Sequence, residues 1–85
     1  MLFVFPDSAP RAFWMKNTLI PLSIAFMDEK GRILNILEMR RLTEENYFSE
    51  GNAMFALEME SGWYSAHSVR AGDRVEGVLN APKGE

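Results

Sequence analysis

Two apolar segments flank a short polar turn near the start of the chain, and this arrangement constrains the fold most strongly. Residues 22–28 alternate, with Leu22, Ile24 and Phe26 on one side and Ser23, Ala25 and Met27 on the other. The turn at residues 28–31 ends on glycine, as a hairpin turn of this length favours. Residues 32–39 then return as the partner strand, with Leu34 and Ile36 expected on one face and Ile33 and Leu37 on the other. The sequence therefore predicts an antiparallel hairpin here.

Four other segments also have the character of strands. Residues 1–5 are wholly apolar, which predicts a strand buried on both faces. A turn is expected at residues 6–10, which begin and end with proline, followed by a short strand over residues 12–16. Residues 53–60 alternate and predict a further strand, with Phe55, Leu57 and Met59 opposite Met54, Ala56, Glu58 and Glu60. A last strand is expected over residues 74–79.

One short helix is predicted over residues 62–68. Ser61 is expected to be its N-cap, since a serine side chain can accept a hydrogen bond from the first turn. Trp63 would share a helix face with Ala66 and His67. Residues 40–52 are polar and lack periodicity, which predicts a long exposed loop, either a plain connection or a functional segment. Residues 80–85 are expected to form a frayed tail.

The order of these segments predicts the fold class. No long helix separates the strands, so a parallel sheet built from strand–helix–strand units is not expected. We expect a mainly β protein: a small antiparallel β-sandwich or partly open barrel with one short helix. A chain of 85 residues makes one small domain, residues 1–85, with a thin margin of stability. The chain has no cysteine, so no disulfide can strengthen it.

The charge distribution limits the classes of partner. The net charge is −3. Residues 1–42 carry a small positive balance and residues 43–85 a negative one, without a basic cluster. Because binding to phosphates needs several lysines or arginines on one face, nucleic acid is not expected as a partner. No apolar run reaches the length of a membrane span, and residues 1–5 lack the basic start of a signal peptide. We expect a soluble protein, cytoplasmic as given, or periplasmic if an export signal precedes this sequence.

The most unusual segment for its composition is the run that contains Trp14, Lys16, Asn17 and Thr18. It lies between Pro10 and Pro21 and places a cation and an amide beside an aromatic wall. That combination suits a small polar or anionic ligand. The alternative is an aromatic core residue followed by an Asn-Thr turn. Trp63 is a further candidate anchor for a ligand, although its helix face with Ala66 favours packing in the core.

Glu58 is the most interesting acidic residue. It shares its strand face with Met54 and Ala56, and a carboxylate on a partly apolar face needs a partner. Lys16, Arg70 or Arg74 could supply an ion pair, and this structural role is favoured over that of a catalytic acid. The chain has a single histidine, His67, so a zinc site is not expected, and no cofactor motif is present.

Several motifs together resemble the DUF192 family of uncharacterised bacterial and archaeal proteins, also called UPF0127. They are residues 1–6, F-W-M-K-N-T at 13–18, I-A-F-M-D at 24–28, A-L-E-M at 56–59, and V-R-A-G-D-R-V at 69–75. The resemblance implies a small, mainly β domain, often exported to the periplasm, with no established activity. Members usually have a further segment before the position of Met1, so we expect an incomplete domain or a sheet completed by another chain. Where relatives commonly have glycine after the histidine, this chain has Ser68, and serine adopts a left-handed helix end less readily than glycine.

Three functions are compatible with these features. The first is a domain that binds a small ligand or a partner through Trp14, Lys16 and Asn17. The second is a hydrolase or lyase that uses Glu58 as acid or base, with Lys16 or Asn17 stabilising charge. The third is an assembly module that pairs with a partner strand along residues 1–5. The partner strand can come from a second copy of the chain, which would make a homo-oligomer.

Overall fold

The computed structural model describes residues 1–16 and 18–77. Within these ranges the chain forms four strands and one helix, namely β1 (Leu2–Phe13), β2 (Leu22–Met27), β3 (Ile33–Met39), β4 (Tyr47–Glu60) and α1 (Trp63–Ala66). The strands pair antiparallel in the order β1-β4-β2-β3. The prediction of a mainly β, antiparallel fold with one short helix is therefore confirmed.

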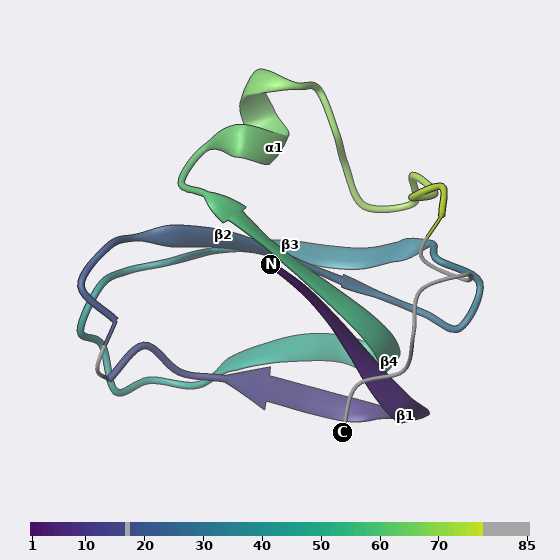
Figure 1. Ribbon diagram of the computed structural model, residues 1–85, viewed down its shortest axis with the longest axis horizontal. Helices are drawn as coiled ribbons and strands as arrows, with labels where there is room; N and C mark the ends of the chain where they lie inside the picture. Colours follow the sequence, from purple (N-terminus) through teal and green to yellow (C-terminus); the bar gives the residue numbers. More distant parts are fainter. Residues whose placement is uncertain (17, 78–85) are drawn as a thin grey trace.

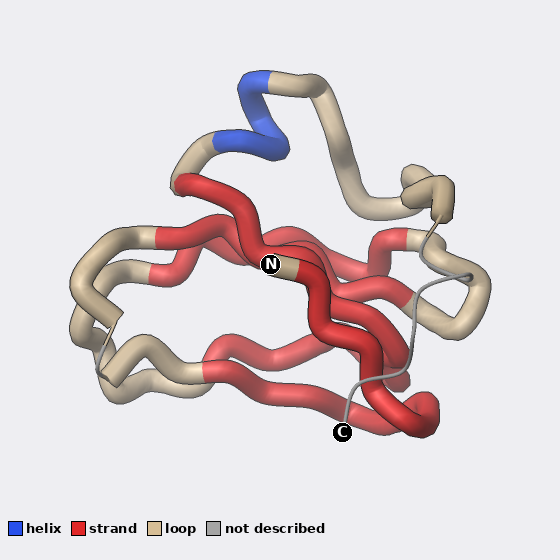
Figure 2. Tube along the Cα trace, viewed as in Figure 1, coloured by secondary structure: helices blue, strands red, loops and turns tan. Residues whose placement is uncertain are grey.

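Strands β1 and β4 are long, and they bend together, so the sheet folds back on itself (Figures 1 and 2). Leu2, Phe3 and Val4 pair with the second half of β4, which also pairs with β2. After a register shift between Val4 and Ala9, the rest of β1 pairs with the first half of β4. This second stretch, residues 9–13 of β1 with residues 47–53 of β4, is called the folded-back arm below. It runs beneath β2 and β3, on the side opposite α1 (Figure 1).

The two faces of the sheet carry separate cores. The helix-side core lies toward α1, and its buried members are Val4, Ala25, Met27, Ile33, Phe55 and Tyr64. The arm-side core lies toward the folded-back arm, and its buried members are Met15, Ile24, Phe26, Met39, Tyr47, Ala53 and Ala56. Strand β2 contributes to both, which explains why it is apolar or small at nearly every position.

The hairpin of β2 and β3 forms as predicted, with one local difference. The turn is closed by hydrogen bonds between Asp28 and Arg32, and Gly31 has the positive φ of 80° that favours glycine. The predicted faces of β2 are confirmed. In β3, however, a register shift opposite Phe26 and Met27 leaves Leu34 as an extra residue. Ile33 and Ile36 therefore face the helix-side core, whereas Leu34 and Leu37 face the arm-side core.

Three predictions for the first sixteen residues were wrong. The short strand expected over residues 12–16 is the end of β1, which stops at Phe13 and leaves residues 14–16 outside any strand. The expected turn at residues 6–10 is part of β1, where both prolines are accommodated beside register shifts at the sheet edge. The segment over residues 1–5 is not buried on both faces: only Val4 is buried, and Met1 is 76% exposed. Because β1 is an edge strand, its apolar residues are only partly covered: Val4 enters the helix-side core, whereas Phe3 and Phe5 pack against the border of the arm-side core.

The predicted loop over residues 40–52 is also shorter than expected. Tyr47 already begins β4, and its ring is buried in the arm-side core. The Tyr47 hydroxyl accepts a hydrogen bond from the backbone N–H of Arg40 at 3.1 Å and donates one to Glu45 at 3.0 Å. The ion pair and hydrogen bond with Arg40 hold the pKa of the Glu45 carboxyl below its ordinary value. The buried Tyr47 side chain therefore organises this loop, although the polar composition of residues 40–52 did not indicate any such order.

Helix α1 is shorter than the predicted range and is capped differently. Gly62, in the left-handed conformation, is the N-cap, whereas the Ser61 hydroxyl donates to Glu38 at 3.2 Å. The helix ends in a Schellman motif: Ser68 and Val69 donate to the carbonyls of Ser65 and Tyr64. Ser68 adopts a positive φ of 57°, so the left-handed helix end forms without glycine.

The segment after α1 covers the helix-side core without forming the predicted strand. Arg74 makes only an isolated bridge with Arg32, and residues 76–77 form a turn. The remainder of the predicted last strand, residues 78–79, and the predicted tail lie outside the described residues. The described part of the chain contains no helix long and apolar enough to cross a membrane.

Candidate functional site

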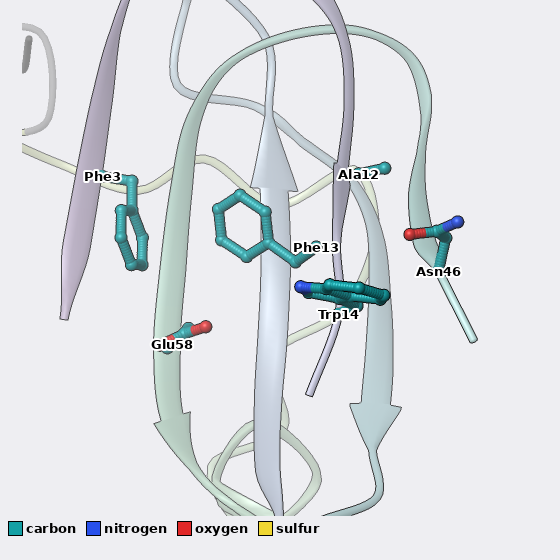
Figure 3. A pocket seen from close by; sticks show the side chains of 6 residues that line it. All are labelled: Phe3, Ala12, Phe13, Trp14, Asn46 and Glu58. Atoms are coloured by element: carbon teal, nitrogen blue, oxygen red, sulfur yellow. The ribbon is translucent and has the colours of Figure 1, made fainter. Parts of the chain in front are cut away.

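An open groove of about 560 Å³ lies where the start of β1, the end of β1 and the second half of β4 meet. Its lining residues are Phe3, Ala12, Phe13, Trp14, Asn46 and Glu58. Figure 3 shows the rings of Phe3, Phe13 and Trp14 around the space into which the Glu58 side chain projects. The bend of β1 creates this site, because it brings Phe3 and Phe13 together from opposite ends of one strand.

Trp14 directly follows β1 and is held in place by its neighbour. Met15 is only 1% exposed, and its backbone N–H donates to the carbonyl of Thr43 at 3.2 Å. Since adjacent side chains of an extended chain point in opposite directions, the burial of Met15 turns Trp14 outward. The Trp14 side chain is 54% exposed, although burying a ring of this size would contribute much to stability. This exposure fits a residue that contacts something other than its own core.

Aromatic rings form a continuous wall beside the groove. The ring centroids of Phe3 and Phe13 are 4.9 Å apart, and those of Phe13 and Phe26 are 5.7 Å apart, both edge-to-face. The buried ring of Phe26 anchors this row in the arm-side core. The wall is therefore held in position before any ligand arrives.

Glu58 is the only titratable side chain among the described residues that line the groove. It is half-buried, and burial raises the pKa of its carboxyl above the ordinary value, against an opposing effect of the Met1 ammonium. Between described residues, the ion pairs are Arg11–Asp7 and Arg40–Glu45. The ion pair predicted for Glu58 with Lys16, Arg70 or Arg74 was therefore wrong, because none of these side chains reaches the groove.

The structure brings together only some of the residues predicted to form the site. Trp14 and Glu58 line the same groove. Lys16 is exposed and lies over the Trp14 ring, with Nζ 5.5 Å from the ring centroid. The backbone of Thr18 links two loops: its N–H donates to Met15, and its carbonyl accepts from Leu42 at 3.0 Å. Asn17 lies outside the described residues.

Trp63 lies apart from the groove. It packs against the helix-side core, beside Tyr64, and its ring stacks on His67 with centroids 4.1 Å apart. Leu57 contacts that core, whereas Glu58, the next residue of β4, faces the groove. The interpretation of Trp63 as a packing residue agrees with this position.

Sequence reasoning missed four of the residues that line the groove: Phe3, Ala12, Phe13 and Asn46. Phe3 and Phe13 were assigned to separate strands with a turn between them, so no pattern indicated that they would meet. For Glu58 the signal was the alternation of residues 53–60, which placed its carboxylate on a partly apolar strand face.

A polar cluster at the start of β2, on the side of the sheet that carries α1, was also missed. Ser23 is fully buried, and its hydroxyl donates to the Glu38 carboxylate at 2.6 Å. The Gly62 N–H donates to Ser23 Oγ at 2.9 Å and to Glu38 at 3.1 Å. These bonds fasten the turn before α1 to the sheet, so the cluster has a structural role. In the described part of the chain, no group of three or more His, Asp or Glu side chains is placed to hold a metal ion.

The comparison with protein families identifies the chain. The model of DUF192, described as Uncharacterized ACR, matches residues 1–77. The chain belongs to the DUF192 family. Two of the motifs that carry the resemblance, F-W-M-K-N-T and A-L-E-M, supply Trp14 and Glu58. In the folded DUF192 domain these two motifs meet at the same groove.

Two solved structures resemble this DUF192 domain over most of its length. One is described as a proposed transcription regulator (R01717) from Sinorhizobium meliloti 1021, with 34% identity, a TM-score of 0.88 and 93% of this chain covered. The other is a protein of unknown function from Novosphingobium aromaticivorans DSM 12444, with 31% identity, a TM-score of 0.86 and 89% covered. The present chain spans 62% and 55% of their respective lengths. Among curated proteins, none matches this sequence.

Proposed function

We propose that this DUF192 domain binds a small ligand in the groove formed by Phe3, Phe13, Trp14 and Glu58. The observation that carries the proposal is the pairing of a half-exposed tryptophan with a half-buried carboxylate in one groove. Small-molecule sites are mostly apolar, with a few polar groups that fix the orientation of the ligand. The lining of this groove has that composition.

The charge in the groove favours a ligand that is polar and not anionic. The sequence suggested a small polar or anionic ligand, and the anionic choice depended on Lys16, which lies over Trp14 and does not line the groove. The carboxylate that does line it, Glu58, accepts hydrogen bonds and attracts positive charge. A ligand with an apolar body and a donor or cationic head is therefore the best match.

Binding is favoured over catalysis at this site. A carboxyl with a raised pKa suits proton transfer, which supports the alternative of an enzyme that uses Glu58. Acid–base reactions of this kind usually need a second group for the opposite role or for charge stabilisation. Among the described lining residues only Asn46 could assist, and Lys16 lies outside the groove. We therefore assign Glu58 to recognition.

A fragment screen by two-dimensional NMR of the uniformly ¹⁵N-labelled chain tests this proposal. Small aromatic, amine and alcohol fragments should shift the backbone signals of Phe13, Trp14 and Glu58 together. The variant Trp14→Ala should abolish these shifts, whereas Trp63→Phe, on the other face of the sheet, should leave them unchanged. If every fragment that binds shifts signals elsewhere, or if Trp14→Ala binds normally, the groove is not the site.

A second candidate is assembly through β1, which the sheet order favours. Strand β1 is an edge strand, so one row of its backbone groups is open to a partner strand, including a second copy of the chain. Pro6 and Pro10 limit such pairing to the first residues of β1. Sedimentation at high micromolar concentration tests this idea: a dimer abolished by Phe3→Pro supports it, and a monomer at all concentrations contradicts it.

The description of the Sinorhizobium meliloti relative does not extend readily to this chain. Transcription regulators that contact DNA need a basic face, because phosphate contacts supply much of the affinity. The net charge here is −3, and the second half of the chain is acidic. These charges favour a small ligand over nucleic acid as the partner.

A further inference from the structure

We infer that the groove recognises a quaternary ammonium head, the trimethylammonium group of a small free solute. This inference rests on the proposed binding function and specifies its ligand class. It combines three observations: an aromatic lining, cations already placed on neighbouring rings, and a carboxylate that carries charge without offering a hydrogen-bond donor.

The aromatic lining supplies the first part of the recognition. Phe3, Phe13 and Trp14 stand around the groove, and the faces of such rings carry negative electrostatic potential (Figure 3). Aromatic rings around a groove are the recurring arrangement for binding quaternary ammonium ligands. Trp14 has the most suitable ring of the three, and it is also the most exposed.

Cations of the protein itself already lie over two aromatic rings, one in the groove and one beside it. The Arg11 guanidinium lies over the Phe5 ring, 4.1 Å from its centroid, and the Phe5 ring is 6.2 Å from that of Phe13. The Lys16 ammonium lies 5.5 Å from the Trp14 centroid. The Lys16 contact shows that positive charge can approach the Trp14 ring, and the Arg11 contact shows the same for Phe5, which neighbours Phe13. Lys16 would then compete with a cationic ligand for Trp14.

Glu58 supplies the charge that selects a cation. Its carboxylate is half-buried in the groove, and no described residue forms a hydrogen bond to it; the Met1 ammonium bonds the Glu58 backbone carbonyl instead, at 2.6 Å. A primary ammonium brings a strongly held hydration shell, which would be costly to remove beside three apolar rings. A trimethylammonium group has no N–H and presents methyl groups to the rings, so it loses less on entering. The groove volume of about 560 Å³ leaves room for such a head with a short tail.

Choline and its neutral carbon isostere, 3,3-dimethyl-1-butanol, test the inference directly. Both are titrated into the Trp63→Phe variant, in which tryptophan fluorescence reports on Trp14 alone. The structure leads us to expect choline to bind about tenfold more tightly than the isostere, the ratio that a desolvated cation–π contact supports. Equal affinities would overturn the inference but leave the binding function standing. If neither compound binds, and if NMR also detects no fragment in the groove, both the inference and the proposed binding function are overturned.

Charge variants sharpen this test. Glu58→Gln should remove most of the preference for choline over the isostere, whereas Glu60→Gln, the same change two residues further along β4, should preserve it. Lys16→Gln should strengthen choline binding several-fold, because it removes a competing cation from Trp14. Weaker choline binding by Lys16→Gln, or an unchanged preference in Glu58→Gln, would contradict the inference. Tetramethylammonium replaces choline as a check that the hydroxyl is not required.

The source of the head group is tested with vesicles. The same chemistry is present on phosphatidylcholine, so cosedimentation with phosphatidylcholine vesicles is measured beside the choline titration. Binding to free choline without cosedimentation supports a small solute. Cosedimentation without binding of free choline or tetramethylammonium would overturn the assignment to a free solute.

Discussion

Asn35 of β3 is bonded through its side chain to the backbone of Phe48 in the folded-back arm. Its Nδ2 donates to the Phe48 carbonyl at 3.0 Å, and its Oδ1 accepts from the N–H of Glu50 at 3.0 Å. One amide side chain therefore takes the place of strand pairing between β3 and the first half of β4. These bonds connect β3 to the folded-back arm, and so they support the curvature of the sheet that forms the groove.

Removal of this amide should destabilise the domain. Asn35→Ala is expected to lower the free energy of unfolding by about 1–2 kcal/mol, because two backbone groups lose their partner. Asn52→Ala is the matched control, since Asn52 is exposed on β4 and its side chain forms no hydrogen bond with described residues. Urea unfolding monitored by circular dichroism measures both variants. Equal stability of the two would show that Asn35 does not hold the arm.

Ser68→Gly should stabilise the chain. Ser68 has a φ of 57° in the Schellman motif after α1, and a residue with a Cβ atom is strained in this conformation. Glycine removes the strain but gains freedom when unfolded, so the net gain should be about 0.5–1 kcal/mol. Ser65→Gly, inside α1, should instead destabilise by a similar amount. Thermal unfolding of both variants checks the opposite signs, and the same sign for both would refute this account of the helix end.

Glu58→Gln should stabilise the fold at neutral pH while it weakens binding. Burial raises the pKa of Glu58 in the folded state, so the folded chain holds this proton more tightly than the unfolded chain. The resulting stability is present below the pKa of the unfolded carboxyl and is lost as the pH rises through the higher folded value. The melting temperature of Glu58→Gln should therefore exceed that of the parent chain by about 2 °C at pH 7.

The pH dependence of this difference identifies its cause. Near pH 4 the parent carboxyl is largely protonated, so the two chains should melt at nearly the same temperature. Glu60→Gln, with an exposed carboxyl, serves as the control for the change in net charge. A difference between Glu58→Gln and the parent that stays constant from pH 4 to pH 7 would exclude desolvation of Glu58 as the reason.

The two tryptophans should respond differently to truncation. Trp14→Ala is expected to change the free energy of unfolding by less than about 1 kcal/mol, because the ring is 54% exposed. Trp63→Ala should cost about 2–3 kcal/mol, since that ring packs on the helix-side core and stacks on His67. Chemical unfolding of the two variants tests this contrast. A large loss from Trp14→Ala would make Trp14 a structural residue and weaken the case for a binding groove.

The locally encoded parts of the fold could be predicted, and the parts that depend on distant contacts could not. The hairpin of β2 and β3 followed from alternation and from a turn ending in Gly31, which are properties of adjacent residues. The exchange of faces after Leu34 could not be foreseen, because the register shift depends on how β3 meets β2. Likewise, two prolines within residues 6–10 indicated a turn, but pairing with β4 holds that segment in a strand.

The candidate site shows the same division. Trp14 and Glu58 were singled out from the sequence because their types were unusual for their positions. That they share a groove with Phe3 and Phe13 depends on the bend of β1, and Trp63, selected by the same reasoning, lies on the other face of the sheet. Residue type identifies a candidate, but proximity depends on chain geometry.

The sequence by itself determined the fold class, the hairpin, the position of the short helix and membership of the DUF192 family. Each of these follows from local periodicity or from a contiguous motif. Only the tertiary structure decided which aromatic residues meet, which face of β4 carries Glu58 into the groove, and that Lys16 is left outside it. These facts depend on two long strands that bend together, and the bend is fixed by contacts between residues far apart in the chain, such as Asn35 with Phe48.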